Sequence, residues 1–140
     1  MGRILAIDYG QKRVGLAVTD ELQIIATALD TVHSKDIIDY LKNYMATEPV
    51  DCIVVGEPRQ MNNTASESVK FIDPFVRRLK KVFPDKKIDR HDERFTSKIA
   101  SQTMISAGLK KKDRQNKSTI DKISAVIILQ SYMEYKAANN

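Results

Sequence analysis

Residues 4–18, ILAIDYGQKRVGLAV, consist of two apolar runs joined by a short polar turn that contains Gly10. Apolar runs of this length on either side of a tight turn are typical of a β-hairpin. Asp8 then stands at the end of the first strand, next to the turn. The chain is therefore expected to begin with two antiparallel strands.

The rest of the chain continues as a regular succession of elements. A third strand is expected over residues 23–32, and a helix follows through Ile37, Leu41 and Met45 until Glu48-Pro49 ends it. Further strands are expected over residues 51–55 and 87–91. Further helices are expected over 65–82, 97–107 and 119–136, with a loop over 109–118 and a kink at Pro74.

This order predicts one α/β domain over residues 1–140, with a mixed five-stranded sheet flanked by helices on both faces. Strands one to three are antiparallel. Right-handed crossovers place strands four and five parallel to strand one, on its side away from strand two. This is the order of the ribonuclease H-like fold. It brings Asp8 and the Gly56-Glu57-Pro58 segment to one edge of the sheet, where open α/β sheets bind ligands.

Composition limits the possible partners and compartment. The net charge of +5 and the pI near 9.3 favour a polyanion such as nucleic acid. The single cysteine, Cys52, cannot form an internal disulfide and is expected in the core. The N-terminus has no signal-peptide pattern, and the longest apolar run, 125–129, is too short to span a bilayer. We expect a cytoplasmic protein without membrane contact.

Three acids, Asp8, Glu93 and Asp121, each lie where a strand ends or a helix begins. Each has a local interpretation, because Asp8 can accept turn hydrogen bonds, Glu93 can pair with Arg94, and Asp121 can satisfy amides in the first turn of its helix. Together they favour a metal site, since the predicted fold gathers them. Mg²⁺ or Mn²⁺ suits such a site, because hard cations prefer carboxylate oxygens and bind substrate phosphates as well.

The residues Asp8-Tyr9-Gly10, Arg13-Val14-Gly15-Leu16-Ala17, Gly56-Glu57-Pro58, Asp92-Glu93-Arg94 and Asp121 resemble the motifs of the YqgF/RuvX family, in the same order. That family is described as Holliday-junction resolvases and as nucleases that mature the 5′ end of the precursor of 16S ribosomal RNA. The resemblance implies that Asp8, Glu93 and Asp121 are the catalytic, metal-binding acids, with Mg²⁺ or Mn²⁺ as the cofactor.

Two positions depart from the family pattern. The family usually has Leu where this chain has Glu57, and Asp-Gly where it has Asn62-Asn63. Asn tolerates the left-handed backbone region, so the turn is expected to survive. A carboxylate at the end of strand four would point to the cleft of Asp8, which makes Glu57 a candidate fourth metal ligand. The alternative is a solvated surface charge.

Basic residues near the same edge are candidates for contacts with the phosphates that flank the scissile bond. These are Lys12, Arg13, Arg59, Arg94, Lys98, Lys110, Lys111, Lys112, Arg114 and Lys117. Any single one of them has the alternative of a solvated surface charge. His91 lies near Glu93, but a structural or exposed histidine is the favoured interpretation, and His33 is assigned no role.

The sequence therefore predicts a metal-dependent nuclease acting on structured nucleic acid, as a monomer or weak homodimer, and the resemblance favours processing of the 5′ end of pre-16S rRNA. A Holliday junction resolvase acting on branched DNA is the alternative substrate assignment. Two other classes stay open: a nucleotide-binding phosphotransferase, which would need a second such domain, and a ribosome-assembly factor that binds nucleic acid without cleaving it.

Overall fold

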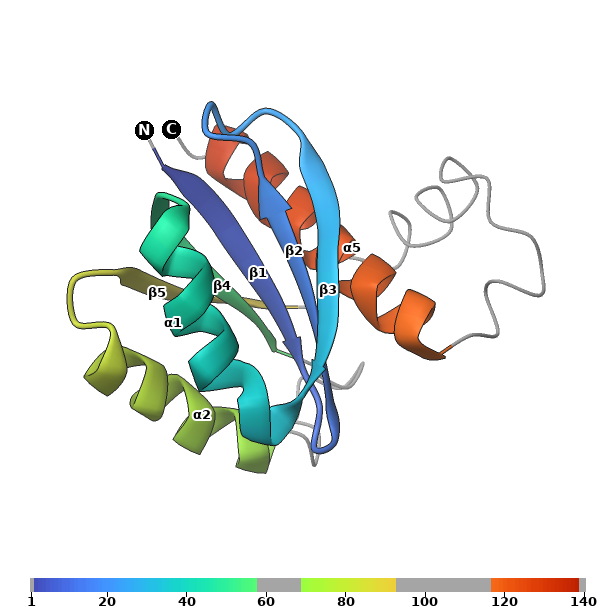
Figure 1. The fold of residues 1–140 in the computed structure, drawn as a ribbon. Helices are drawn as coiled ribbons and strands as arrows, with labels where there is room; N and C mark the ends of the chain where they lie inside the picture. The colour runs from blue at the N-terminus through green and yellow to red at the C-terminus, as the bar shows by residue number, and fades with distance from the viewer. Residues whose placement is uncertain (1, 58–68, 93–116, 139–140) are drawn as a thin grey trace.

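The computed structural model describes residues 2–57, 69–92 and 117–138, and these form a five-stranded sheet covered by helices (Figure 1). The strands are β1 (Arg3–Tyr9), β2 (Arg13–Thr19), β3 (Ala26–His33), β4 (Val50–Glu57) and β5 (Lys87–Asp92). They lie in the order β3-β2-β1-β4-β5. The sheet is the one that the order of apolar patterns predicts.

Strand directions also confirm the prediction. The strands β1, β2 and β3 pair antiparallel, whereas β4 is parallel to β1 and β5 is parallel to β4. In the pairing of β1 with β4, Ile7 lies opposite Val55, and in that of β4 with β5, Gly56 lies opposite His91. The carboxyl ends of the three parallel strands therefore meet at one edge of the sheet.

Helices cover both faces of the sheet (Figure 1). After the short 3₁₀ turn η1 (Ser34–Asp36), the helices are α1 (Ile37–Thr47), α2 (Val69–Val82) and α5 (Lys117–Ala138). The helices α1 and α2 lie on one face of the sheet, and α5 crosses the other face. α2 contains Pro74, as the helix expected over residues 65–82 does, and the expected kink there stays a prediction. Residues 65–68 lie outside the described part of the chain. Among the described residues, no helix is long and apolar enough to cross a membrane.

Alternation along each strand divides the core into two layers. Leu5 and Ile7 of β1 pack against α1 and α2, whereas Ile4 and Ala6 pack against α5. Burial on both faces explains why the central strands are continuous apolar runs. Cys52 belongs to the α5 layer, as expected of a core residue, and burial raises the pKa of its thiol.

The third strand begins at Ala26 rather than at residue 23, because a tight turn occupies the preceding residues. The Asp20 carboxylate accepts the backbone N–H groups of Ile24 and Ile25 at 2.7 and 2.9 Å, and Gln23 has a left-handed φ of 59°. These hydrogen bonds lower the pKa of Asp20. The turn leaves Leu22 and its two isoleucines exposed.

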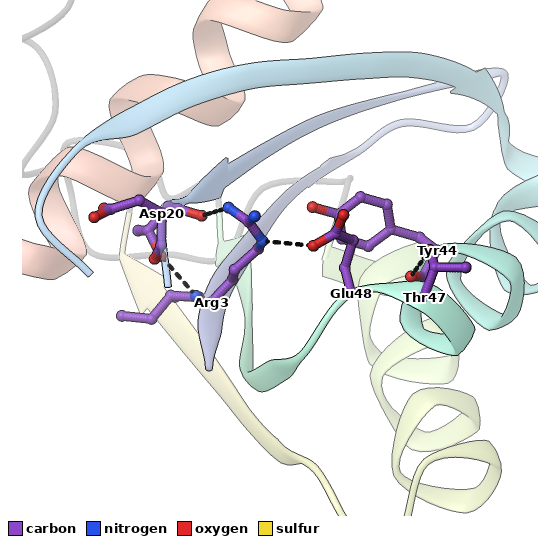
Figure 2. A network of polar contacts seen from close by, with 7 residues as sticks. Arg3, Asp20, Tyr44, Thr47 and Glu48 are labelled. Carbon is purple, nitrogen blue, oxygen red and sulfur yellow. Dashed lines mark hydrogen bonds and ion pairs between the residues drawn. The ribbon is translucent and has the colours of Figure 1, made fainter. Parts of the chain in front are cut away.

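Arg3 ties the start of β1 to two other elements (Figure 2). Its guanidinium donates to a Glu48 carboxylate oxygen at 3.2 Å, just after α1, and to the Thr19 carbonyl at 2.9 Å, at the end of β2. Both partners are distant in sequence. The contacts fix the amino end of β1, so that the strand reaches its opposite end in a defined register.

Candidate functional site

Asp8 lies one residue before the end of β1, the central strand of the sheet. It is opposite Gly15 of β2, and its side chain is half-buried. It lines an open pocket of about 220 Å³ together with Gly10, Gln11, Lys12 and Arg13. The predicted acid Asp8 thus lines the pocket together with two basic residues, Lys12 and Arg13.

The β1–β2 turn that forms this pocket is held by the backbone. The N–H of Gly10 donates to the carbonyl of Arg13 at 3.0 Å, and a Cβ on Gly10 would lie 2.6 Å from that same oxygen. Ser34 donates from its N–H to the Lys12 carbonyl at 3.1 Å, and from its hydroxyl to the Gln11 carbonyl at 2.5 Å. The turn is therefore fixed to the segment that begins α1, and Lys12 and Arg13 are exposed on it.

The other two acids of the predicted trio are placed less completely. Glu93 follows Asp92, the last residue of β5, and lies outside the described residues. Asp121 lies in the second turn of α5, and its side chain is outside the described part of the chain. α5 runs in the opposite direction to β1, so its first turns lie toward the end of the sheet where β1 ends (Figure 1). The convergence of Asp121 with Asp8 stays a prediction.

α5 begins earlier than expected, and this changes the setting of Asp121. The helix includes Lys117, which was expected in the loop, and it includes Thr119, which was expected at the helix start. Ser and Thr resemble N-caps in sequence, but the cap position depends on where the backbone leaves the helix. Asp121 is consequently inside the helix rather than in its first turn.

Glu57 has a different neighbour from the one expected. Its carboxylate pairs with the Arg90 guanidinium at 3.3 Å, and Arg90 also pairs with Asp73 of α2 at 2.7 Å. These contacts lie on the face covered by α1 and α2, whereas strand alternation puts Asp8 on the face of Ala6 and α5. A ligand role would require the carboxylate to leave Arg90, and it stays a prediction.

Of the predicted phosphate contacts, Lys12 and Arg13 lie at the pocket. Lys117 is placed in α5 by its backbone alone. The remaining ones lie outside the described residues: Arg59, Arg94, Lys98, Lys110, Lys111, Lys112 and Arg114. The expected helix over residues 97–107 lies there too. Their contacts with substrate stay predictions.

His91 is buried, at 5% exposure, and its Nε2 shares a hydrogen bond of 2.7 Å with the hydroxyl of Ser131 in α5. One residue further along α5, the Tyr132 hydroxyl donates to Asp89 at 2.8 Å. Burial, then the hydrogen bond to Asp89, raises the pKa of Tyr132. This buried polar layer joins β5 to α5, and the local sequence gave no signal for it. His33 also has a role that was not expected, since its Nδ1 accepts the N–H of Lys35 at η1.

The oxygen donors at the carboxyl ends of the parallel strands decide whether a divalent cation can bind there. Asp8 offers a hard oxygen donor at a polar pocket, which is the donor type that Mg²⁺ and Mn²⁺ take. Within residues 2–57, 69–92 and 117–138, no three described metal-ligating side chains lie together. The donor that the structure describes fits such an ion, and Glu93 and Asp121 would have to complete its shell.

Comparison with known proteins identifies the family. The family model RuvX, described as Holliday junction resolvase, matches residues 2–135. The chain belongs to the RuvX family. This confirms the resemblance carried by the Asp8-Tyr9-Gly10 and Asp92-Glu93-Arg94 motifs.

Relatives within the RuvX family match almost the whole chain. A protein of Bacteroides thetaiotaomicron is 57% identical over 136 residues, which cover 97% of this chain and 99% of that protein. A protein of Flavobacterium johnsoniae has the same identity and coverage, and one of Porphyromonas gingivalis is 52% identical over 134 residues, covering 96% and 97%. All three are named "Putative pre-16S rRNA nuclease".

Solved structures confirm the ribonuclease H-like fold of this RuvX chain. The structure "T. thermophilus RuvC in complex with Holliday junction substrate" matches with a TM-score of 0.61 and 14% identity, covering 99% of this chain and 96% of that one. A second structure, "Thermus thermophilus RuvC structure", matches with a TM-score of 0.56 and 12% identity, covering 96% of each. At these identities the likeness concerns the fold alone.

Proposed function

We propose that this protein is a divalent-cation-dependent nuclease that hydrolyses phosphodiester bonds in structured RNA, and that it processes the 5′ end of pre-16S rRNA in the cytoplasm. The observation that carries the proposal is the position of Asp8, at the carboxyl end of the central strand and on a pocket shared with Lys12 and Arg13. The names of the relatives support the substrate, and the family description supports the reaction class.

Three carboxylates would hold the cation: Asp8, with Glu93 and Asp121. A divalent cation bound there would act as a Lewis acid and would lower the pKa of a bound water. Asp8 fits this role because it lies on a strand that pairs on both sides, so its backbone cannot shift without breaking the sheet.

Lys12 and Arg13 would orient the substrate. Both lie on a turn fixed by Gly10 and Ser34, so little backbone entropy is lost when their side chains meet a phosphate. Contacts of this kind position the backbone of a nucleic acid without reading its sequence. Positive charge beside the scissile phosphate also stabilises negative charge that develops during hydrolysis.

The test is a cleavage assay with Mn²⁺ and matched RNA and DNA substrates. A precursor 16S rRNA fragment, a four-way DNA junction and single-stranded controls are incubated with the wild type and with Asp8→Asn. We expect the rRNA precursor to be cut by the wild type, and the Asp8→Asn variant to lose at least about a hundredfold in rate. Cleavage retained in Asp8→Asn would contradict the proposed site.

A resolvase acting on branched DNA is the second candidate, since the family description names that activity. It predicts symmetrical cuts in the junction by a homodimer, with the rRNA precursor left intact. A non-catalytic assembly factor predicts a third outcome, in which the RNA is bound equally well by the wild type and Asp8→Asn and neither cuts it. The same assay separates the three.

A further inference from the structure

Positive charge is concentrated on two short segments of the sequence, residues 69–87 and residues 110–117, and the structure describes the first of them. Residues 69–87, which comprise α2 and the turn into β5, contain seven basic residues and two acidic ones, a net charge of +5. The whole chain also has a net charge of +5, so the remaining residues carry sixteen of each sign. A segment with as much net charge as the whole chain therefore lies outside the pocket of Asp8.

These charges are exposed on the outer side of α2. The helix buries Ile72, Val76 and Leu79 in the core, so its other side faces solvent. The α2 basic face consists of Lys70, Arg77, Arg78, Lys80 and Lys81 of the helix, with Lys86 of the following turn. All of these except the half-buried Lys86 are exposed. Lys87 begins β5 and lies on its α5 side by strand alternation, so it is not part of this face.

The two arginines of this face, Arg77 and Arg78, are not balanced by carboxylates of the described residues. Asp73 is the only acid within α2, and it already pairs with Arg90 of β5 at 2.7 Å. No carboxylate of the described chain forms an ion pair with Arg77 or Arg78. Arg90 therefore occupies the carboxylate that α2 itself carries.

The spacing of the charges has a cost in the isolated protein. Arg77 lies three and four residues before Lys80 and Lys81, and Arg78 lies three before Lys81, so like charges are neighbours on the helix surface. Each such pair destabilises a helix by about 0.2–0.5 kcal/mol. The helix dipole favours the two lysines of the last turn but not the arginines before them. A bound polyanion would remove this repulsion.

The position of α2 relates this face to the candidate site. α2 starts after β4 ends and leads back to Lys87, which pairs with Cys52 near the start of β4. α2 thus runs from the end of the sheet where β1 ends toward the opposite end, on the face of the sheet away from α5 (Figure 1). Lys70 lies in its first turn, and the other basic residues lie in its second half and just after it. A 14-residue helix is about 21 Å long, and a double helix carries one phosphate charge per about 1.7 Å of its axis. A duplex carries about a dozen phosphate charges over that length, counted on both strands, so those on the side that faces α2 are enough to meet its basic residues.

We propose that the α2 basic face is a second nucleic-acid-binding surface, which holds the phosphate backbone of a double-helical segment flanking the cleavage point. The inference deepens the proposed nuclease function and rests on it for the placement of the scissile bond. Contacts of this kind follow the backbone and do not read bases, so RNA and DNA duplexes share the required chemistry. An anionic membrane is disfavoured, because the apolar side of α2 is buried in the core.

Two variants with the same net charge test the surface. Arg77→Gln/Arg78→Gln removes two charges from the α2 basic face, and Lys35→Gln/Lys42→Gln removes two exposed charges from the α1 side. All four side chains are exposed, so neither variant should melt more than about a degree below the wild type. Loss of the like-charge repulsion on α2 should raise the melting temperature of the arginine variant. Binding is measured by fluorescence anisotropy at several salt concentrations, with an RNA duplex and a DNA duplex of the same sequence. EDTA is present so that cleavage does not interfere.

We expect Arg77→Gln/Arg78→Gln to weaken duplex binding about tenfold and to reduce the slope of log affinity against log salt by about 1.8, while the lysine variant keeps the wild-type values. Equal weakening by both variants would mean that only net charge matters, and would overturn the proposal. So would unchanged binding in the arginine variant, or binding to phosphatidylserine vesicles in place of duplexes. Tighter binding of the RNA duplex or of the DNA duplex by the wild type shows which of the two nucleic acids the α2 basic face holds.

The failure of this surface and of the proposed nuclease function can be told apart. If the arginine variant loses duplex binding but Asp8→Asn cuts normally, the α2 surface stands and the site assignment falls. If Asp8→Asn abolishes cleavage and the arginine variant binds duplexes like the wild type, the nuclease stands and the α2 surface falls.

Discussion

His91 and Ser131 share a buried hydrogen bond of 2.7 Å that joins β5 to α5. His91 lies two residues before Glu93, and Ser131 lies ten residues after Asp121. The bond therefore connects the two elements that carry the second and third predicted acids. Buried polar groups with a single geometry fix the register of the elements that they join.

Replacing Ser131 with alanine should leave the His91 ring nitrogen without this partner in the core. We expect the free energy of unfolding to fall by about 1–3 kcal/mol, because a buried polar group that loses its hydrogen bond keeps its desolvation cost. Urea unfolding at neutral pH measures the change. Glu134→Ala, exposed on the same helix, should change it by less than about 0.5 kcal/mol. Equal effects would show that the buried bond contributes nothing.

Gly10→Ala should distort the turn that carries Lys12 and Arg13. The added Cβ would lie 2.6 Å from the Arg13 carbonyl oxygen, which is closer than carbon and oxygen atoms approach. We expect a loss of about 1–3 kcal/mol in stability, together with weaker binding of the RNA substrate. Gln11→Ala at the exposed neighbouring position is the control for stability. A variant that melts like the wild type would show that the turn yields easily.

Glu57→Gln separates the ion pair with Arg90 from a ligand role. The Glu57 carboxylate is 15% exposed, so removing its charge should lower stability, by up to about 1 kcal/mol after allowance for solvent screening. In the wild type the Glu57 carboxylate pairs with Arg90 rather than with a cation. We therefore expect the Mn²⁺ affinity of Glu57→Gln, measured by calorimetry, to equal that of the wild type. A clear drop in affinity would instead establish Glu57 as a ligand.

Divalent cations should raise the melting temperature of the wild type. A ligand that binds only the folded state stabilises it by about 2.7 kcal/mol at a hundred times its dissociation constant. Differential scanning fluorimetry with millimolar Mg²⁺ or Mn²⁺ should show a shift of several degrees, and Asp8→Asn should show none. A shift of the same size in both proteins would place the cation elsewhere.

Tyr40 should make stability depend on pH in the alkaline range. Burial, then the charge of Asp30 and a hydrogen bond to it, raises the pKa of Tyr40 from 10.0 to about 12. Because the unfolded chain loses this proton first, the stabilisation is complete below pH 10 and disappears as pH rises to about 12. Urea unfolding across this window should show a smaller decline in Tyr40→Phe than in the wild type. Parallel declines would exclude Tyr40 as the source.

The sequence predicted the sheet because its signals are local. Three antiparallel strands follow from apolar runs with short connections and no helix before residue 37, and the later alternation of helices and strands predicts crossovers. Each of these sequence signals extends over only a few residues. The start of β3 was wrong because the Asp20 carboxylate and the left-handed Gln23 form a turn that apolar Ile24 and Ile25 conceal. The start of α5 was wrong because Thr119 resembles a cap within a helix that is already formed.

Long-range partners limited the prediction of the site. Asp8 was placed correctly at the end of β1, since strand and turn are adjacent in sequence. The partner of Glu57 is Arg90, 33 residues away, and the partner of His91 is Ser131, 40 residues away. Such pairs depend on strand register and helix packing, which no local pattern specifies.

The placement of α5 has a consequence for biosynthesis. Its residues Ala125, Ile128 and Leu129 cover Ile4 and Ala6 of β1, so one of the two core layers forms only when this late segment is available. Until then, a nascent chain on the ribosome presents the uncovered apolar side of its central strands to solvent. The emergence of α5 from the ribosome is therefore the step that ends this exposure to chaperones and to aggregation.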